Sequence, residues 1–234
     1  MSNKTEKKEI LIDAFEEKLD KILTEVKEKN TTQIVDILTA ILLSLATIGS
    51  AWCAYQSTLW GGVQTFELAA MSKAGRLSSE NTIRANQKRT NDGLMLIQYL
   101  NSIEEGNNKM RDFYFSRFDT VLKVATLDWL KTDPFNNHNS PNSPMRMANY
   151  ELQEETEALV QLQLSAKKLE SANQANQTSD RYVLLTVLFA AVLFFGGIAN
   201  TMRSSLIRNL CMILSAIIFI LTLLVLSSMP VTSI

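Results

Sequence analysis

The sequence predicts an all-α integral membrane protein, with three transmembrane helices and a helical hairpin or bundle domain inserted between the first two of them. Three observations indicate this fold class. Long stretches of the chain carry no charged residue, no segment shows the alternation typical of strands, and glycine and proline are sparse before Pro134. A helix of about 20 apolar residues crosses the hydrocarbon core while satisfying its own backbone polar groups.

The composition excludes several classes of function. The 23 basic and 24 acidic residues give a net charge of −1, which argues against a basic nucleic-acid clamp. Two cysteines and one histidine are too few for a four-ligand zinc site within one chain or for a disulfide scaffold. We therefore expect no nucleic-acid partner, no metal and no cofactor, and the lipid bilayer is the first partner that the sequence predicts.

Residues 1–32 predict a charged amphipathic helix ahead of the first span. Its apolar side chains recur at helical spacing, and they are Ile12, Phe15, Leu19, Ile22 and Val26. Glu17 and Lys21 form a favourable pair one turn apart. So short a helix needs a partner, which is either another protomer in a coiled coil or the membrane surface.

Residues 33–60 predict the first transmembrane helix, because no charge occurs between Asp36 and Glu67. The apolar run begins only after a long charged segment and exceeds the apolar core of a signal sequence. Trp52 is too bulky to precede a lipidated Cys53. We therefore expect this span to be retained.

Residues 61–180 predict the extramembrane helical domain. We expect the first helix to continue past the Gly61–Gly62 pair into a polar stretch rich in small residues. A second helix is predicted from Leu94 to Lys131. It has one apolar face that would form the core of the domain, made of Phe118, Leu122, Ala125 and Trp129.

Residues 134–144 predict a loop by composition. The last helix of the domain is predicted from Ala148 to about Thr178. It places five residues at heptad-like positions, and they are Leu152, Leu159, Leu162, Ala166 and Leu169. The chain then enters the second transmembrane helix at 181–202, and a third follows at 206–228, so the last two spans form a hairpin.

Basic residues favour the cytoplasmic side of a membrane. Arg203 and Arg208 lie around the turn between the second and third spans, and Lys27 and Lys29 lie ahead of the first span on the same side. This predicts a multi-pass protein of the cell (inner) membrane, with its N-terminus in the cytoplasm and its helical domain outside.

Aromatic and polar residues gather where the first span is expected to leave the membrane and the second to enter it. They are Trp52, Tyr55, Gln56, Trp60, Gln64, Asn173, Asn176, Asp180, Arg181 and Tyr182. One interpretation is an aromatic belt in which Arg181 reaches lipid phosphates. The other is a polar cluster that couples the helical domain to the spans, through binding of lipid headgroups.

Small residues within the spans predict close packing of membrane helices. They are Ala40, Ser44, Thr47, Ala51, Gly196 and Gly197. No glycine pair precedes the Lys-Ser/Thr of a phosphate-binding loop. No Asp, Glu, Lys or Arg lies in the apolar core of any span, which weakens the case for a transporter.

The sequence contains no catalytic constellation. His138 stands in a loop rich in Asn and Pro, without a neighbouring carboxylate or nucleophile. Cys53 and Cys211 are expected near opposite membrane faces, too far apart for a disulfide. We interpret His138 as a solvated loop residue, and Cys53 and Cys211 as small packing residues.

Two sequences at the membrane borders, AWCAYQSTLWGGVQ (51–64) and ANQTSDRYVLLTVLFAAVLFFGGIA (175–199), resemble a family of uncharacterised bacterial membrane proteins. The middle segment with Phe118 and Trp129 is similar as well. The resemblance covers most of the chain after residue 40. It implies one N-terminal span, a helical middle and a C-terminal hairpin of spans, and it implies no activity.

Three hypotheses of function follow. The first is a non-enzymatic scaffold or sensor that forms a homo-oligomer and offers its helical domain to a protein partner. The second is a homo-oligomeric channel lined by Ser44, Thr47 and Ser50, with Asn200 near the opposite mouth. The third is a membrane enzyme or accessory subunit that acts on lipid, and it ranks last because the border has no catalytic side-chain set. We favour the scaffold.

Overall fold

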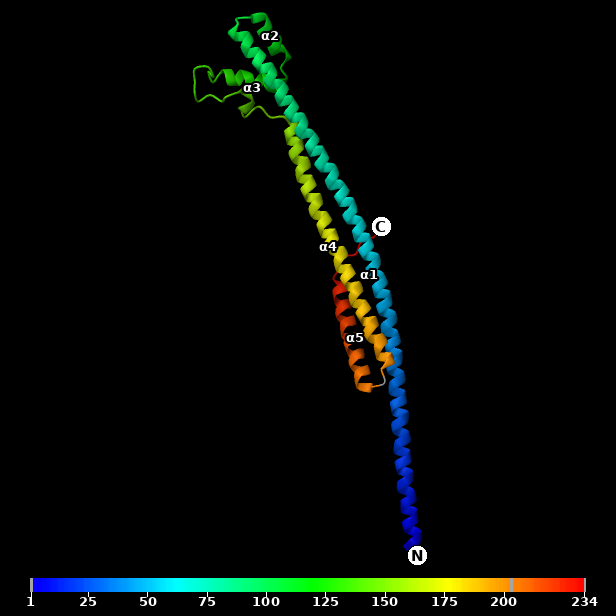
Figure 1. Cartoon of the computed structure of the whole chain (residues 1–234). Helices are drawn as coiled ribbons and strands as arrows, with labels where there is room; N and C mark the ends of the chain where they lie inside the picture. Colours follow the sequence, from blue (N-terminus) through cyan, green and yellow to red (C-terminus); the bar gives the residue numbers. More distant parts are fainter. Residues whose placement is uncertain (1, 203, 234) are drawn as a thin grey trace. The chain divides into compact units, whose positions relative to one another are not determined.

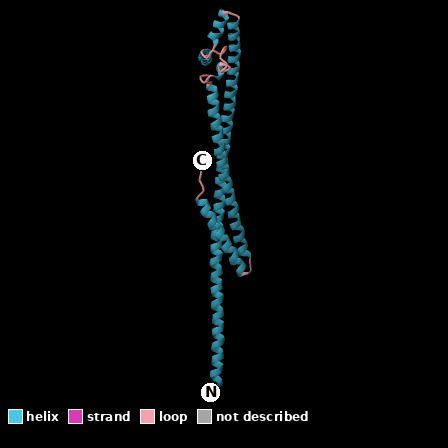
Figure 2. Ribbon diagram, turned by 90° about the vertical axis from the view of Figure 1, so that its left-hand side faces the viewer, coloured by secondary structure: helices cyan, strands magenta, loops and turns pink. Residues whose placement is uncertain are grey.

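The computed structural model of the chain describes residues 2–202 and 204–233, with side chains described at Lys18, Lys21 and from residue 34 onward except 203. Within these residues the structure is helical and contains no strand (Figures 1 and 2). The elements are α1 (Ser2–Glu104), α2 (Asn108–Arg117), α3 (Thr120–Leu130), the 3₁₀ helix η1 (Pro144–Arg146), α4 (Gln153–Thr201) and α5 (Ser205–Ser227). The predicted all-α fold class is confirmed.

The chain divides into two compact units. The span unit comprises Met1–Gly62 and Ala175–Ile234, and the middle unit comprises Val63–Gln174, where the sequence predicted a domain at 61–180. Helices α1 and α4 each contribute to both units. The side chains on which the predicted N-terminal amphipathic face depends lie outside the described residues, and they are Ile12, Phe15, Leu19, Ile22 and Val26.

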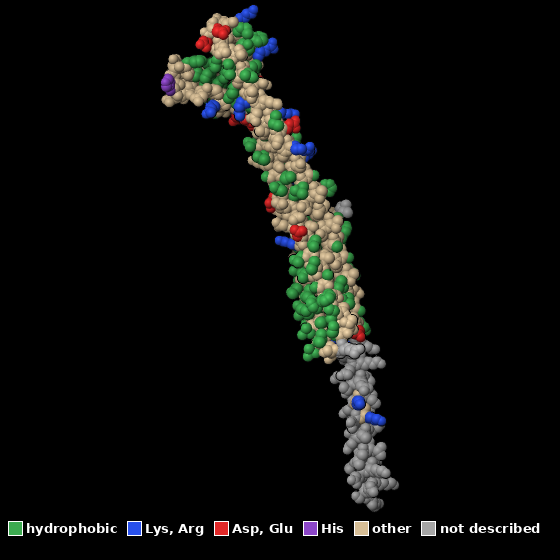
Figure 3. Space-filling model, in the orientation of Figure 1, with side chains coloured by type: hydrophobic (Ala, Val, Ile, Leu, Met, Phe, Trp, Pro, Cys, Tyr) green, Lys and Arg blue, Asp and Glu red, His purple; other side chains and the backbone are tan. Residues whose placement is uncertain are grey.

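The span unit contains the three predicted membrane-crossing helices. The part of α1 from Ile34 onward, α4 and α5 each hold a stretch long and apolar enough to span a bilayer. Only a short turn separates Thr201 at the end of α4 from Ser205 at the start of α5, as predicted for a hairpin. Hydrophobic side chains gather on the outer face of α5 and the neighbouring part of α4 (Figure 3).

The core of the span unit combines aromatic rings with glycines. Phe189 is fully buried, and its ring centroid lies 6.0 Å from that of Phe219. A Cβ placed on Gly49 would lie 2.6 Å from Cζ of Phe189, and one placed on Gly196 would lie 2.7 Å from a methyl carbon of Leu43. The two glycines therefore permit the close approach of these helices.

Within the span unit, α1 packs through Thr39, Ala46 and Cys53, which are fully buried and recur every seven residues. The small residues singled out in the sequence lie elsewhere on α1 and are exposed in the single chain, and they are Ala40, Ser44, Thr47 and Ala51. Gly197 also faces open space, since a Cβ placed on it would meet no atom within 4 Å. A role for these residues in packing between protomers stays a prediction.

In the middle unit, α1 and α4 run antiparallel along a seam of small residues. Ala158, Ser165 and Ala172 recur every seven residues on α4. Ser78 of α1 donates a hydrogen bond to the Ala158 carbonyl at 2.8 Å, and Ser165 donates one to the Met71 carbonyl at 3.1 Å. Each helix thus bonds to the backbone of the other, which requires the close approach that small side chains allow.

The five residues predicted at heptad-like positions of the last domain helix differ in burial. Leu152 is buried, but the other four are exposed, and they are Leu159, Leu162, Ala166 and Leu169. The physical reason is the small-residue seam, which brings α4 closer to α1 than a leucine face permits. The leucine face is turned sideways, away from α1.

The helix predicted from Leu94 to Lys131 is interrupted twice. Gly106 adopts a positive φ of 65° after α1 ends, and the side chain of Asn107 then caps α2. Asp119 caps α3 by accepting a hydrogen bond from the Leu122 backbone N–H at 2.8 Å. Asn and Asp are preferred N-caps because their side chains satisfy free N–H groups of the first helical turn.

The predicted core of the domain is confirmed, since Phe118, Leu122, Ala125 and Trp129 are all buried. The Phe118 ring lies 5.4 Å from that of Tyr99 on α1, edge to face. This contact packs the residues just before α3 onto the end of α1.

Candidate functional site

The residues of the predicted border cluster fall into both units. Gln64 and Asn173 belong to the middle unit, and the other eight belong to the span unit. Within the span unit, we divide the eight into a buried set, in which Trp60 is half-buried, and an exposed set, in which Asn176 is half-buried. The buried set makes four hydrogen bonds to the segment that follows α5.

Gln56, Trp60 and Tyr182 form the buried set, together with the segment that follows α5, residues 229–233, which we call the post-span segment. Gln56 is 1% exposed and Tyr182 is fully buried. The Trp60 indole N–H and the Tyr182 hydroxyl both donate to the carbonyl of Pro230, each at 3.1 Å. The Gln56 side chain pairs with the backbone of Thr232, donating to its carbonyl and accepting from its N–H, also at 3.1 Å.

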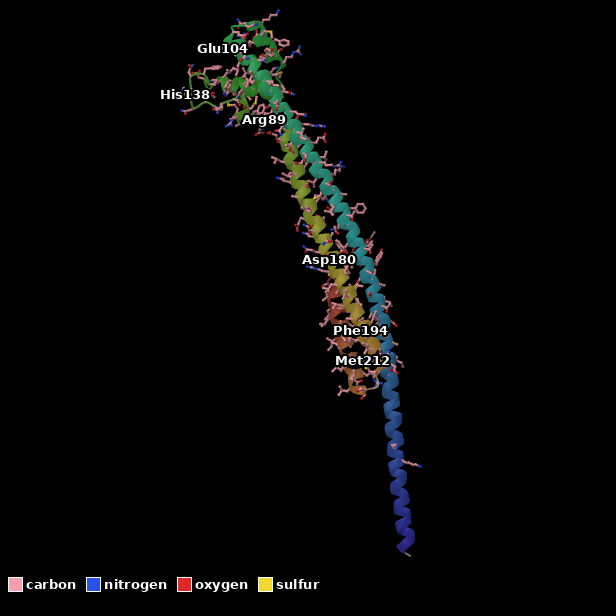
Figure 4. All side chains as sticks on the ribbon, in the orientation of Figure 1. Arg89, Glu104, His138, Asp180, Phe194 and Met212 are labelled. Carbon is pink, nitrogen blue, oxygen red and sulfur yellow. The ribbon has the colours of Figure 1, made fainter. Side chains whose placement is uncertain are left out.

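The exposed set contains two groups. Trp52 and Tyr55 lie on the outside of α1 with ring centroids 5.9 Å apart. On α4, the half-buried Asn176 donates at 3.1 Å to the carboxylate of Asp180, which is exposed (Figure 4). Arg181 is exposed as well. This arrangement accords with an aromatic and charged belt facing the lipid–water boundary.

Sequence reasoning missed the post-span segment and one further contact. Ser57 and Ser179 bring α1 and α4 together, because the Ser179 hydroxyl donates to the Ser57 carbonyl at 3.0 Å and their hydroxyl oxygens also lie 3.0 Å apart. Pro230, which cannot continue α5, was the only signal for the post-span segment. Its fold-back depends on tertiary contacts that no local pattern encodes.

A second polar cluster lies in the middle unit around Asp92, which is 4% exposed. The Tyr150 hydroxyl donates to its carboxylate at 2.7 Å. Nearby, Lys88 lies 2.9 Å from the carboxylate of Asp119, which caps α3. The cluster thus joins α1 both to α3 and to the segment before α4.

Arg89 extends this cluster toward α4 (Figure 4). Its guanidinium lies 2.5 Å from the Glu155 carboxylate and 6.0 Å from the centroid of the Tyr150 ring. Both partners of the ion pair are partly exposed, so its net contribution to stability is small. Its value is positional, because it sets α1 beside the start of α4.

The two carboxyl groups of the cluster have opposite pKa shifts. Burial raises the pKa of Asp92, and this outweighs the lowering by the Tyr150 hydrogen bond and by Lys88. Burial also acts to raise the pKa of Asp119, but the bonds from the Leu122 N–H and from Lys88 together lower it. Burial and the bond to Asp92 raise the pKa of Tyr150 well above its usual value.

We expect Asp92→Asn to leave the middle unit at least as stable as the natural chain at pH 7. A carboxyl group with a raised folded-state pKa contributes stability below its unfolded pKa, and this is lost as the pH rises through the raised value. The amide is uncharged throughout and keeps an acceptor for Tyr150. Hydrogen exchange of the middle unit in a urea series at pH 4 and pH 7 measures this, and a larger benefit at pH 4 than at pH 7 would contradict it.

Tyr150→Phe is the matched change, because it removes the donor of the hydrogen bond from Tyr150 to Asp92. It leaves the buried Asp92 carboxylate without its donor and should cost roughly 1–2 kcal/mol at pH 7. In the Asp92→Asn background the same change should cost less, because no charge is left unpaired. Equal costs in the two backgrounds would show that Tyr150 acts only through packing.

The remaining candidates for chemistry stand apart from one another. His138 is exposed in the loop after α3 (Figure 4). Cys53 is buried, Cys211 is half-buried, and both are free thiols. Among the described residues, no three His, Cys, Asp or Glu side chains are grouped closely enough to hold a metal ion.

Comparison with known protein families, with curated proteins and with solved structures finds no match for this chain. The resemblance to a bacterial three-span family therefore stays a prediction, and the functional argument depends on the geometry alone.

Proposed function

We propose that this chain is a non-enzymatic integral membrane protein that self-associates as a scaffold or sensor. The observation that carries the proposal is an unpartnered apolar stripe on α4 in the middle unit. It consists of Leu159, Leu162, Ala166 and Leu169, and we call it the α4 stripe. Leu159 and Leu162 are 60% and 56% exposed, in a part of α4 that carries six charged residues between 153 and 170.

The spacing of the α4 stripe is that of a coiled-coil seam. Its members are separated by three, four and three residues, so they follow one side of the helix as the a and d positions of a heptad do. The small-residue seam already satisfies the packing of α4 on α1. The α4 stripe therefore supports association with a second helix of the same kind.

A second copy of the chain fits the stripe better than a charged partner does. On the side of the stripe away from α1, the positions that would flank the a/d seam are Gln163 and Glu170. On the other side, Ala158, Ser165 and Ala172 already pack along α1. No row of like charges therefore opposes a symmetric pair. Copies inserted in the same direction run parallel, so equivalent residues would meet across a two-fold axis.

The span unit offers a matching face. The small residues Ala40, Ser44, Thr47 and Ala51 follow one side of α1 with spacings of four, three and four. The hydroxyls of Ser44 and Thr47 donate to carbonyls of their own helix at 2.8 and 2.9 Å, so neither requires water. A face of this kind favours close packing between protomers in the bilayer.

Disulfide cross-linking in native membranes tests the self-association. In a Cys53→Ala, Cys211→Ala background, Leu162→Cys should form a covalent dimer rapidly on mild oxidation, because equivalent d positions of a parallel pair lie within disulfide reach. Leu164→Cys is the matched control, since it is exposed on the same helix but lies off the stripe. Equal cross-linking at both positions would indicate random collision and would overturn the proposal.

We further infer that the protein lies in the inner membrane with its N-terminus in the cytoplasm and its middle unit outside. The basic residues that flank the α4–α5 turn support this orientation. In the same cysteine-free background, a membrane-impermeant maleimide should label His138→Cys in intact cells and leave Lys18→Cys unlabelled. The reverse labelling pattern would invert the orientation.

A further inference from the structure

We propose that Gln56, Trp60 and Tyr182 form a binding site for an extended peptide backbone, and that the post-span segment is its resident ligand. The chemical class of ligand is a short extended peptide, read through its main chain. Each of the three spans contributes, because Gln56 and Trp60 belong to α1, Tyr182 belongs to α4, and the ligand follows α5.

The four hydrogen bonds in the site end on backbone atoms of the ligand. The Pro230 carbonyl accepts from Trp60 and from Tyr182. Two residues later, the N–H and carbonyl of Thr232 pair with the two ends of the Gln56 amide. This is the reciprocal pairing by which an extended strand is recognised in β-augmentation, here supplied by a side-chain amide.

The side chains of the ligand contribute little to this recognition. Val231 is 63% exposed and lies between the two bonded residues. Met229 is the one side chain of the segment that packs on the core of the span unit. The site therefore specifies an extended main chain with a carbonyl at one position and an N–H and carbonyl two positions later.

The polar groups of Gln56, Trp60 and Tyr182 need hydrogen-bond partners. With the post-span segment in place, Gln56 is 1% exposed, and its amide carries two N–H donors and one acceptor oxygen. A buried amide without partners is unfavourable, and the penalty is greater where water is scarce. The post-span segment gives each of the three binding side chains at least one hydrogen-bond partner, and it links the end of α5 to α1 and α4.

Hydrogen exchange at the Thr232 amide of the full chain in nanodiscs provides the first test. We expect exchange at least about tenfold slower than in an unstructured peptide, because this N–H donates to Gln56. Gln56→Leu should abolish the protection and Trp60→Phe should weaken it. The matched controls Val231→Ala and Thr232→Ala should retain it. Unprotected exchange in the natural chain, or equal loss in the controls, would overturn the proposal.

Binding in trans provides the second test. A variant ending at Ser228 should bind a fluorescent peptide of sequence SMPVTSI, measured by anisotropy in nanodiscs. The same peptide with an N-methyl group on its threonine lacks the donated N–H and should bind at least about tenfold more weakly. Equal binding of the two peptides, or binding of neither to a variant whose α1–α5 hydrogen exchange matches that of the full chain, would contradict recognition through the backbone.

Discussion

Replacing Leu122 with alanine is expected to lower the free energy of unfolding of the middle unit by about 2–5 kcal/mol. Leu122 is fully buried in the cluster that joins α3 to α1, where Phe118, Ala125 and Tyr99 are also buried. Removing its side chain leaves a cavity that these rings cannot fill, because they are already packed against one another. The loss should appear as a lower urea midpoint for hydrogen exchange across α3.

The matched control for this change is Leu127→Ala in the same helix. Leu127 is 48% exposed, so its truncation should change the stability by no more than about 0.5 kcal/mol. A similar effect for both substitutions would mean that helix propensity, and not the buried cluster, determines the stability of α3. The cluster would then not be the core of the middle unit.

Replacing Phe189 with alanine should destabilise the packing of the span unit by about 3–5 kcal/mol. The ring fills the space above Gly49, packs edge to face on Phe219 and is fully buried. Truncation therefore removes contacts with both α1 and α5. Reversible unfolding by sodium dodecyl sulfate in mixed micelles measures the change.

Two further variants separate packing from hydrophobicity at this position. Phe194→Ala removes the same ring from a lipid-facing position of α4, where Phe194 is 61% exposed (Figure 4), and should have little effect. Gly49→Leu should be strongly destabilising in the natural chain, since any Cβ at Gly49 meets the Phe189 ring, and less so in the Phe189→Ala background. Additive effects of the two changes would exclude a direct contact between these positions.

The features that the sequence predicted well depend on composition over long windows. The three spans follow from charge-free stretches such as the one between Asp36 and Glu67, where the bilayer requirement leaves few alternatives. The core around α3 follows from four apolar residues at helical spacing, Phe118, Leu122, Ala125 and Trp129. Both patterns are properties of single segments, so no knowledge of the partner helix is needed.

The features that the sequence did not predict depend on which face of a helix packs against its neighbour. On α4, leucines and small residues both repeat with heptad spacing, and only the partner helix decides which of them forms the seam. Serines decide it here, because Ser78 and Ser165 gain hydrogen bonds across the seam. The leucine stripe, which the sequence placed at heptad-like positions without deciding its partner, is exposed in the single chain, and it is the main support for self-association.

The sequence predicted the side chains of the buried part of the border cluster but not the backbone groups that they bind. Gln56, Trp60 and Tyr182 could be selected as polar and aromatic residues near the membrane boundary. Their shared ligand could not, because Pro230 and Thr232 take part through backbone atoms that every residue type possesses. Main-chain recognition leaves no signature in side-chain patterns.

The most direct test of self-association is the mass of the intact protein in lipid nanodiscs, measured by native mass spectrometry across a concentration series. We expect a discrete homo-oligomer for the natural chain. Combined Leu159→Gln, Leu162→Gln and Leu169→Gln changes should reduce its mass, whereas Val160→Gln with Leu164→Gln should not. A closed ring of many protomers would bring the channel forward as the function to assay. A strict monomer at every concentration would contradict the account.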